Sequence, residues 1–327
     1  MREAHPYESL DPDAVLNAVE WAGFQCDGRL LALNSYENRV YQVGVEDASP
    51  VIAKFYRPGR WTNEQIIEEH LFSAELQNLD IPVVGPLPLN DGETLHEHGG
   101  FRFAVFERRQ GRWPELDSAE HKALIGRLLG RMHAVGALRQ FEHRPELNVD
   151  THGWQALKAL RVSDCIPPDM LGNVVAGAEA LLGAVEVRMA EAYPNLQRIH
   201  GDFHLGNVLW AQGGPNVVDL DDCCTGPAIQ DLWMLLSGDL DQRTGQFTEV
   251  LRGYSEFCHF DQRELALIEP LRGLRMVRYA GWIAQRWTDP AFERAFPWFT
   301  TPRYWEEQII GFREQLMVLD EPPLYLL

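Results

Sequence analysis

The strongest constraint on how this chain folds is a polar loop that runs into two short apolar segments. The loop carries Asp202 and Asn207, and the apolar residues 208–210 and 217–218 lie on either side of a Gly-Gly-Pro turn. Apolar runs of this length around such a turn predict the two strands of a β-hairpin. The hairpin would have Asp202 and Asn207 before its first strand and Asp219 directly after its second strand.

The spacing of these three polar residues, five and then twelve positions, has a chemical interpretation. Asp202 can accept a proton from an attacking hydroxyl, whereas Asn207 and Asp219 offer oxygen atoms to Mg²⁺. Hard divalent cations that bind beside phosphates use such a sparse oxygen set and keep water and phosphate as further ligands. Protein kinases place a catalytic Asp, an Asn and a later metal-binding Asp in the same order. The pattern therefore predicts phosphoryl transfer from ATP with Mg²⁺.

Two other interpretations of the loop stay open. Asp, Asn, Gly and His are common in turns, so the loop can be purely structural. His200, Asp202 and His204 alternate, as zinc ligands on one extended segment would, but a zinc site needs further His or Cys ligands at a suitable spacing. The neighbouring Cys223 and Cys224 fit poorly, because adjacent residues rarely converge on one ion.

Length and charge bound the domain organisation and the partners. A chain of 327 residues predicts two domains, which we assign to residues 1–107 and 108–327. The net charge of −19 argues against nucleic acid or an anionic membrane as the main partner. The first ten residues are polar and no apolar run approaches membrane length, so we expect a cytoplasmic protein without a membrane partner.

Alternating apolar patterns in the N-terminal part predict a helix over residues 11–22 and strands near residues 30–33, 40–43 and 50–56. Lys54 lies inside the last of these strands. A buried ammonium needs anionic partners, such as phosphates and a glutamate, although many lysines extend to solvent instead. The helix expected over residues 62–79 offers Glu64, Glu68 and Glu69. We favour Glu69 over Glu68 as the partner of Lys54, but the spacing alone does not separate them.

The C-terminal part is expected to be mainly helical. After a strand at residues 101–106, the polar residues 107–111 are interpreted as the hinge between the two lobes. The predicted helices cover residues 118–138, 171–193, 265–287 and 304–319, and one more opens at Gly226-Pro227. Two polar residues on these helices are interpreted as structural: His133, and Asp231, which needs hydrogen-bond donors that the backbone of the 200–207 loop can supply.

The chain lacks the sequence motifs of several other enzyme classes. The chain has no G-x4-G-K-[ST] loop and no G-x-G-x-x-G after a strand, which disfavours P-loop and dinucleotide-binding folds. It has no G-x-S-x-G nucleophile elbow. The turn at residues 34–38 also contains no glycine, unlike the Gly-rich loop of ordinary protein kinases, so Ser35 and backbone N–H groups would have to cover the phosphates.

Motifs spread over most of the chain carry a resemblance to a known family. They are His200-Gly201-Asp202-x-His204-x-Gly206-Asn207 with Asp219, and residues 33–41, 54–58, 68–70, 103–106, 218–222, 226–236 and 268–272. The first motif resembles the aminoglycoside-phosphotransferase and choline-kinase group. The longer segments resemble the bacterial stress-response protein kinases of that group.

The resemblance implies an α+β fold of the bilobal protein-kinase type, with a small N-terminal antiparallel β-sheet lobe and a larger, mainly helical C-terminal lobe. It implies Asp202 and Asp219 as catalytic residues, Asn207 and Asp219 as Mg²⁺ ligands, and Ser35 and Lys54 as contacts of the ATP phosphates. It also implies a Glu of the following helix, for which we favour Glu69, as the partner of Lys54 in the cofactor site. The implied activity is ATP-dependent phosphorylation of Ser and Thr in proteins during a cytoplasmic stress response.

We further expect a monomer that is itself a phosphoprotein. The alternative activity is that of a small-molecule kinase acting on a choline-, homoserine- or aminoglycoside-like alcohol. A cationic acceptor of that kind would suit the acidic chain and the additional carboxylates Asp221 and Asp222.

Overall fold

A computed structural model describes residues 5–325, which divide into two compact units. The first unit is discontinuous in sequence and consists of Met1–Glu115, Phe141–Arg144 and His204–Cys223. The second consists of Leu116–Gln140, Pro145–Phe203 and Cys224–Leu327. The assignment of nucleotide binding to residues 1–107 and of catalysis to residues 108–327 stays a prediction.

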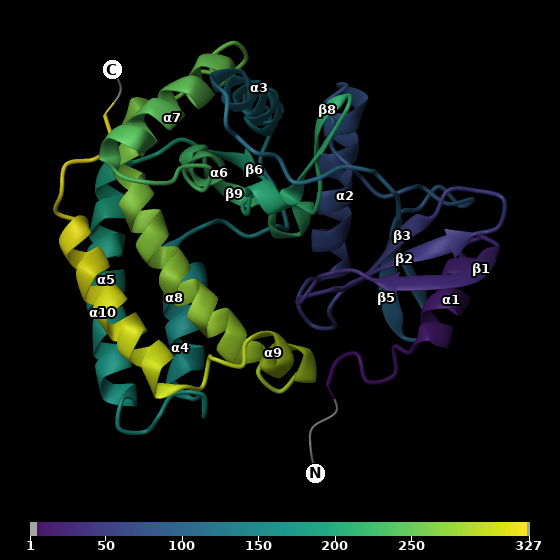
Figure 1. Ribbon diagram of the computed structural model, residues 1–327, viewed down its shortest axis with the longest axis horizontal. Helices are drawn as coiled ribbons and strands as arrows, with labels where there is room; N and C mark the ends of the chain where they lie inside the picture. The colour runs from purple at the N-terminus through teal and green to yellow at the C-terminus, as the bar shows by residue number, and fades with distance from the viewer. Residues whose placement is uncertain (1–4, 326–327) are drawn as a thin grey trace. The chain divides into compact units, whose positions relative to one another are not determined.

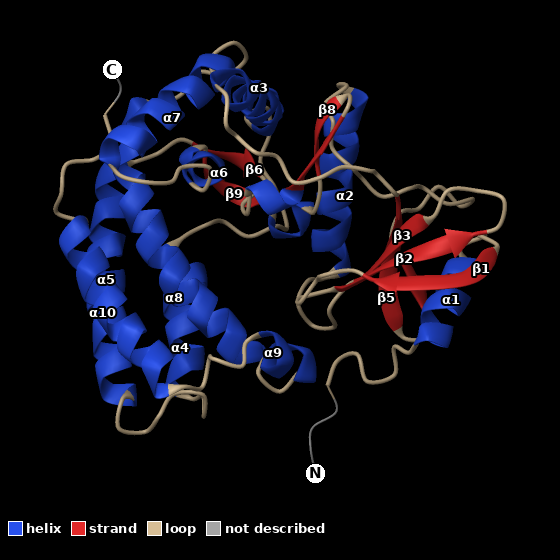
Figure 2. Ribbon diagram, viewed as in Figure 1, coloured by secondary structure: helices blue, strands red, loops and turns tan. Residues whose placement is uncertain are grey.

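The first unit is built on a five-stranded antiparallel sheet (Figures 1 and 2). In spatial order its strands are β1 (Cys26–Ala32), β2 (Arg39–Val45), β3 (Val51–Phe55), β5 (Phe101–Glu107) and β4 (His96–His98). The strands predicted in the N-terminal part are thus confirmed, each within a few residues. The α+β fold with an antiparallel N-terminal sheet and a mainly helical C-terminal part is confirmed as well.

The two faces of the central strand β3 are covered by different partners. Helix α1 (Pro12–Trp21) begins at Asp11, whose side chain accepts a hydrogen bond from the Ala14 backbone N–H. Its buried side chains share one core with Phe55 of β3. Because successive side chains of a strand point to opposite faces, Lys54 points away from α1. The sheet therefore buries Lys54 on the face that α1 leaves uncovered.

Helix α2 (Asn63–Asn78) lies beside that second face. It starts at a capping box in which Thr62 and Gln65 exchange hydrogen bonds between side chain and backbone. Ile66 of α2 packs with Ala104 of β5 in a small apolar cluster. The apolar stripe of α2 is weak, because Leu71 is exposed while the polar Glu69 is buried. The buried face of α2 thus mixes apolar side chains with polar ones, and the polar side chains need partners of their own.

The predicted hairpin is present in the first unit as β7 (Val208–Ala211) and β8 (Gly214–Val217). Val217 donates a backbone hydrogen bond to Pro82, and its carbonyl accepts one from Val84. Trp210 of β7 exchanges two backbone hydrogen bonds with Arg112. The hairpin is thus joined to the first unit by backbone hydrogen bonds on both of its strands.

The second unit is mainly helical (Figure 2). Its helices are α3 (Ala119–Gly136), the π-helix Asp150–Trp154, α4 (Gln155–Arg161), α5 (Leu171–Ala192), α6 (Ile229–Trp233), α7 (Leu240–Tyr254), the 3-10 helix Gln262–Leu267, α8 (Ile268–Arg286), α9 (Pro290–Ala295) and α10 (Pro302–Val318). Two short strands, β6 (Leu196–Ile199) and β9 (Cys224–Pro227), pair in antiparallel fashion. Among the residues described, every helix is too short or too polar to cross a membrane.

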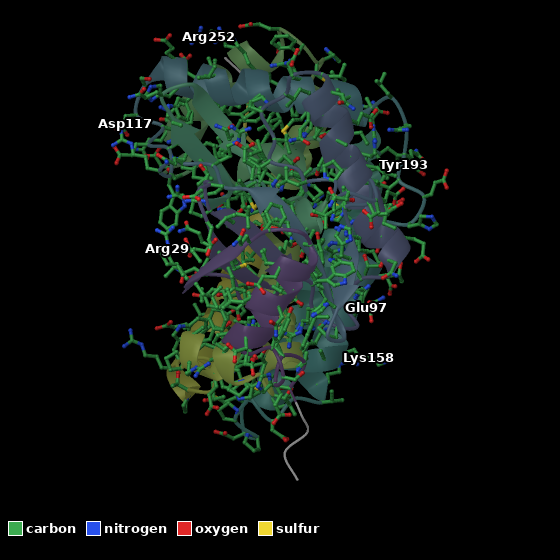
Figure 3. The ribbon with its side chains drawn as sticks, turned by 90° about the vertical axis from the view of Figure 1, so that its right-hand side faces the viewer. Arg29, Glu97, Asp117, Lys158, Tyr193 and Arg252 are labelled. Carbon is green, nitrogen blue, oxygen red and sulfur yellow. The ribbon has the colours of Figure 1, made fainter. Side chains whose placement is uncertain are left out.

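A proline lies just beyond the end of α5, and another lies just before the start of α6. Helix α5 stops at Tyr193, which adopts a left-handed backbone and projects from the surface, 82% exposed (Figure 3). Pro194 follows it and disfavours a helical residue before it. The helix expected to open at Gly226-Pro227 is present as α6, but it starts at Ile229, because Gly226 and Pro227 still belong to β9. Pairing with β6 overrides the local signal there.

Candidate active site

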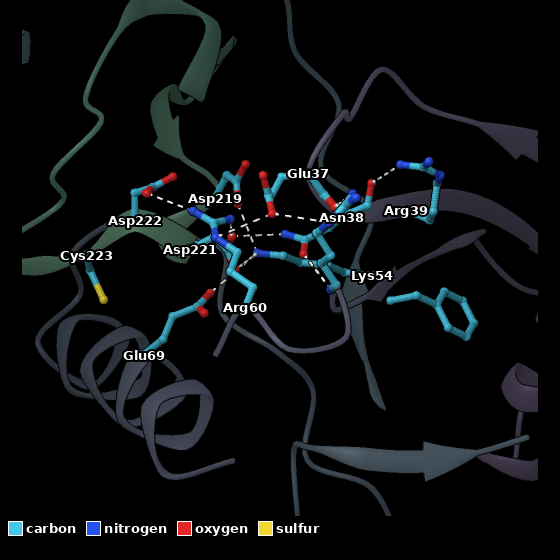
Figure 4. A network of polar contacts seen from close by, with 12 residues as sticks. Glu37, Asn38, Arg39, Lys54, Arg60, Glu69, Asp219, Asp221, Asp222 and Cys223 are labelled. Atoms are coloured by element: carbon cyan, nitrogen blue, oxygen red, sulfur yellow. Dashed lines mark hydrogen bonds and ion pairs between the residues drawn. The ribbon is translucent and has the colours of Figure 1, made fainter. Parts of the chain in front are cut away.

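Lys54 is the centre of a buried cluster of charges in the first unit (Figure 4). It lies opposite Val40 of β2 and Ala104 of β5, and its side chain is only 8% exposed. The Nζ atom is 2.9 Å from Oδ1 of Asp219, 3.3 Å from Oδ1 of Asp221 and 3.6 Å from Oε1 of Glu69. The lysine is therefore held by carboxylates and does not extend to solvent.

The electrostatics of this cluster keep Lys54 charged. Burial by itself would lower the pKa of the ammonium, but Asp219, Asp221 and Glu69 outweigh it and raise the pKa of Lys54 well above its usual value. Burial raises the pKa of Glu69, and the Lys54 ammonium opposes that rise. A buried, permanently charged ammonium beside an open cavity is suited to bind phosphate oxygens.

Glu69 and its neighbour Glu68 have different partners. Glu69 is buried and faces Lys54. Glu68 instead accepts hydrogen bonds from the backbone N–H groups of Glu142, His143 and Arg144, at 2.6, 2.8 and 2.7 Å. Adjacent residues on a helix point about 100° apart, so only one of them can reach the sheet. Glu69 is the glutamate that pairs with Lys54.

Asn207 and Asp219 lie at the two ends of the β7–β8 hairpin. The Val218 N–H donates a 3.0 Å hydrogen bond to the Asn207 carbonyl, which fixes the two ends against each other. Asp219 has a left-handed backbone, with φ 60° and ψ 68°, and its side chain is 52% exposed. A non-glycine residue in this region is uncommon, and such strain is concentrated at functional sites.

A cavity of about 750 Å³ in the first unit brings together five of the six predicted site residues, all except Asp202. Ser35, Lys54, Glu69, Asn207 and Asp219 all line it. Its other walls are largely apolar and are formed by Leu33, Val40, Ile52, Val84, Phe106, Leu209, Val218 and Leu220, next to the polar segment 107–111. A cavity of this size, with apolar walls and a polar floor, suits a flat nucleobase joined to a chain of phosphates.

A second layer of charges lies behind Lys54 and was not apparent from the sequence. Arg60 pairs with Asp221 and, at 2.8 Å, with Asp222. Asn38 donates a 3.0 Å hydrogen bond to Asp221 and accepts one from the Arg57 backbone N–H. Asp221 stays ionised although it is buried, because Lys54 and Arg60 hold its pKa below the usual value. The only sequence signal for this layer was the carboxylate pair itself.

Arg144 completes this layer from a separate segment of the chain. Its Nε donates to the Cys223 carbonyl at 2.8 Å, Nη2 donates to the Asp221 carbonyl, and its guanidinium lies 4.2 Å from the centre of the Trp61 ring. The backbone that follows Asp219 is thereby fixed to the segment that Glu68 binds. Cys223 itself is fully buried.

Asp202 belongs to the second unit, where the loop after β6 is supported by Asp231. The Asp231 carboxylate accepts hydrogen bonds from the His200 and Gly201 backbone N–H groups at 2.7 and 2.8 Å. It also contacts Nε2 of His133 at 3.1 Å. Both structural assignments made from the sequence, for Asp231 and for His133, are confirmed. The buried carboxylate fixes the backbone directly before Asp202.

The side chain of Asp202 has a partner that the sequence did not reveal. Nη1 of Arg275, on α8, lies 2.7 Å from Oδ1 of Asp202. Both side chains are partly exposed, 42% for Arg275 and 28% for Asp202. The helix predicted over residues 265–287 contains several arginines, and the sequence does not single out Arg275 among them.

The donor set of the first unit fits a hard divalent cation. Asn207 and Asp219 supply an amide and a carboxylate oxygen to the same cavity, next to the lysine expected to hold phosphate. The structure does not support the alternative of a zinc site. Within residues 5–325, no three His, Cys, Asp or Glu side chains are arranged to hold one ion. His204 instead uses Nδ1 to accept a hydrogen bond from the Gly206 N–H.

Comparisons with known proteins agree on one family. Residues 29–268 match the phosphotransferase enzyme family known as APH. The chain is 44% identical to stress response kinase A of Escherichia coli K12 over 323 residues, which cover 99% of this chain and 98% of the relative. It is 42% identical, with the same coverage of 99% and 98%, to the serine/threonine protein kinase RdoA of Salmonella typhimurium.

A solved structure shows the same fold. Amicoumacin kinase, in complex with AMP-PNP and Ca²⁺, superposes with a TM-score of 0.73 over 95% of each chain at 23% identity.

Proposed function

The chain belongs to the phosphotransferase enzyme family and is a relative of the stress response kinases, and from this we propose that it transfers the γ-phosphate of ATP to serine and threonine hydroxyls of proteins. That it is a kinase follows from the family. ATP, Mg²⁺ and the protein acceptor are our proposal. We propose further that it acts as a cytoplasmic monomer in a stress response, and that its residues 1–107 form the nucleotide-binding part.

One observation supports the nucleotide part of this proposal above all others. Lys54, Asn207 and Asp219 line one cavity, and ion pairs with Asp221 and Glu69 hold the Lys54 ammonium in place. We propose that the Lys54 ammonium binds the α- and β-phosphates of ATP, with Ser35 contacting the phosphates from the glycine-free turn. Since Lys54 now contacts Asp219 directly, a bound phosphate would take over that ammonium and leave Asp219 free for a cation.

Asn207 and Asp219 are the residues that would hold Mg²⁺. When bound, the cation would neutralise charge on the phosphate oxygens and so favour in-line attack at the γ-phosphorus with ADP as the leaving group. The remaining work of the chain is positioning: the hairpin keeps the two oxygen donors at a fixed separation, and Glu69 keeps Lys54 directed into the cavity.

Asp202 is proposed as the base. Its carboxylate would orient the acceptor hydroxyl and accept its proton as the new O–P bond forms and the bond from the γ-phosphorus to the bridging oxygen breaks, which leaves ADP. Asp231 supports this role indirectly, because it fixes the backbone of residues 200 and 201.

A protein acceptor is supported by the relatives that share nearly the whole chain, one of which is described as a serine/threonine protein kinase. The argument for a cationic small alcohol weakens, since the carboxylates Asp221 and Asp222 that would have attracted it are paired with Arg60.

The test combines two variants with a set of acceptors. Asp202→Ala should abolish transfer of radiolabelled phosphate while nucleotide binding, measured by calorimetry, is largely kept. Asp219→Ala should remove Mg²⁺-dependent nucleotide binding as well. Transfer is measured to the protein itself, to a generic protein substrate and to a panel of amino alcohols. Wild-type turnover by Asp202→Ala would refute the catalytic assignment, and transfer to an amino alcohol alone would refute the protein acceptor.

A further inference from the structure

A segment of four residues, Phe141–Arg144, belongs to the first unit although its neighbours in sequence do not. The chain before it, Leu116–Gln140, and the chain after it, Pro145–Phe203, are parts of the second unit. The four residues form no helix or strand of their own. Contacts with other segments of the first unit must therefore hold them in place, and we call these four residues the clamp segment.

The clamp segment packs against one face of helix α2. Three side chains of α2 contact it, namely those of Gln65, Glu68 and Phe72. The Gln65 side-chain amide donates a 3.0 Å hydrogen bond to the His143 carbonyl, and the Phe72 ring meets the Phe141 ring edge to face with 5.4 Å between their centres. Glu68 accepts its three backbone hydrogen bonds between these two contacts. Helix positions 65, 68 and 72 lie on one side, so the clamp segment fixes the rotation of α2 about its axis.

The rotation of α2 decides where Glu69 points. Each residue of a helix is turned by about 100° from the one before it. While Glu68 points at the clamp segment, Glu69 faces Lys54, whose Nζ atom is 3.6 Å from Oε1 of Glu69. A turn of α2 about its axis would take the Glu69 carboxylate away from that ammonium. The clamp segment therefore acts on the nucleotide cavity through α2.

Arg144 connects the clamp segment with the residues that follow Asp219. Its backbone N–H is bound by Glu68, while its side chain donates to the carbonyls of Asp221 and, at 2.8 Å, of Cys223. The backbone that leaves the left-handed Asp219 is thus held at two carbonyl groups. One residue links α2 with the proposed cation ligand.

Charge also connects Arg144 with Glu69. Oε2 of Glu69 and Nη1 of Arg144 are both buried, and within residues 5–325 neither atom has a hydrogen-bond partner. Burial raises the pKa of Glu69, and the positive charges that oppose this rise are first Lys54 and then Arg144. In the proposed function the ATP phosphates draw on the Lys54 ammonium. Arg144 is then the positive charge that still compensates the Glu69 carboxylate, and a buried charge without a counter-charge is costly.

We propose that Arg144 is a positioning residue of the nucleotide site, which holds α2 and the backbone after Asp219 together and keeps Glu69 directed at Lys54 while ATP binds. Arg144 lies outside the set of described residues that line the cavity. Its effect therefore passes through Glu69 and through residues 219–223. The inference rests on the nucleotide binding of the proposed function, and it adds to that site a residue that lies outside residues 1–107 and outside the β7–β8 hairpin.

The full-length enzyme tests this proposal with Arg144→Met, which keeps most of the side-chain length and its contact with the Trp61 ring but removes the charge. Kd for AMP-PNP in the presence of Mg²⁺, measured by calorimetry, should rise about tenfold or more, because hydrogen bonds from a charged donor are lost. KM for ATP should rise with it, while kcat at saturating ATP changes less. Arg144→Lys keeps the charge and should recover part of the affinity.

A double-mutant cycle with Glu69→Gln tests whether Arg144 acts through Glu69. The factor by which Arg144→Met raises Kd should be at least about threefold smaller in the Glu69→Gln background than in the wild type. Equal factors in the two backgrounds would overturn the inference, and so would wild-type affinity in stably folded Arg144→Met. If Arg144→Met does not fold, Arg144→Gln in the same two backgrounds decides the question.

Arg198→Met is the matched control. Arg198 is as buried as Arg144, 3% against 5% exposed, and donates to two backbone carbonyls of the second unit, those of Val135 and Gly136. Its loss should lower the melting temperature and leave Kd for AMP-PNP unchanged. An equal rise in Kd would show that such variants act only through lost stability, and would overturn the inference.

The proposed function can fail separately from this inference. A wild type that binds AMP-PNP with Mg²⁺ but phosphorylates no protein would refute the protein acceptor, and the role of Arg144 would still be supported by the cycle. A wild type without affinity for AMP-PNP and Mg²⁺ would refute both.

Discussion

At the scale of single residues, Lys54 shows how a charged side chain becomes a buried functional group. Its three carboxylate partners come from α2 and from the segment after β8, which are far apart in sequence. Taking an ammonium out of water is costly unless such partners are fixed in place. Glu69 and Asp221 are the partners that remain with Lys54 if Asp219 turns to a cation. Under the proposed function, the charge of Glu69 therefore affects nucleotide binding.

Glu69→Gln keeps the shape of the side chain and removes its charge. Without that charge Lys54 is less well held toward the phosphates, so we expect kcat/KM for ATP to fall about tenfold or more, which corresponds to at least about 1.4 kcal/mol. Steady-state kinetics with ATP as the varied substrate measure this effect.

The matched variant is Glu68→Ala one residue earlier, which removes the acceptor of three backbone hydrogen bonds. It should lower the free energy of unfolding by about 1–3 kcal/mol with a smaller effect on kcat/KM than Glu69→Gln. The reverse pattern would show that the two glutamates had been assigned the wrong way round.

Glu264 supports a prediction about pH in the second unit. Burial raises its pKa from 4.5 to about 7, although it accepts a 2.8 Å hydrogen bond from the Ile229 backbone N–H. The folded state then binds the proton more tightly than the unfolded state, so stability falls as pH rises from 4.5 to 7, by up to about 3 kcal/mol from this group. Glu264→Gln should flatten that fall and stabilise the protein at pH 8.

Thermal unfolding of the wild type and Glu264→Gln between pH 5 and 8 measures the difference. Glu256→Gln serves as the control, because Glu256 is exposed and Arg127 lowers its pKa instead of raising it. A fall in stability of the same size in the wild type and in Glu264→Gln would contradict the assignment.

At the scale of elements, the sequence predicts helix α3 but does not predict how closely α3 packs against α7. The apolar stripe of α3 is clear, and the helix lies within the predicted range 118–138. Its close approach to α7 depends on glycine: a Cβ at Gly126 would lie 1.9 Å from the Val250 carbonyl oxygen, and one at Gly253 would lie 1.9 Å from that of Ala123. Backbones packed this closely leave no room for a methyl group.

Gly126→Ala should therefore separate the two helices and lower the free energy of unfolding by about 1–3 kcal/mol, despite the better helix propensity of alanine. Gly245→Ala, on α7, is the matched control, because a Cβ there meets no atom within 4 Å. It should stabilise the protein by about 0.5–1 kcal/mol. Chemical denaturation of both variants measures the two values, and a neutral Gly126→Ala would argue against the close crossing.

At the scale of the whole molecule, the first unit cannot be built from the N-terminal part of the chain alone. The Glu68 carboxylate depends on residues 142–144, and Lys54 and Arg60 depend on residues 219–222. The fragment 1–115 would leave buried charges without partners, which is strongly destabilising.

We expect the fragment 1–115 to lack the cooperative thermal transition that full-length protein shows by circular dichroism. Adding residues 204–223 through a flexible linker should recover part of it, because these residues return the carboxylates of Lys54 and Arg60. A cooperative transition of the fragment 1–115 at the temperature of the full-length protein would contradict this view of the first unit.

The sequence by itself determined the strands and helices with clear periodicity and the β7–β8 hairpin, because these depend on local pattern and residue type; the chemistry of the 200–222 segment stays a prediction. It also identified Asp231 as a support, since a carboxylate on an apolar helix face requires donors. Only the tertiary structure decided between Glu68 and Glu69, paired Asp221 and Asp222 with Arg60, and brought Arg275 to Asp202. Arg60 lies 161 and 162 residues from Asp221 and Asp222, and Arg275 lies 73 residues from Asp202. Ion pairs have no periodicity that a sequence could display.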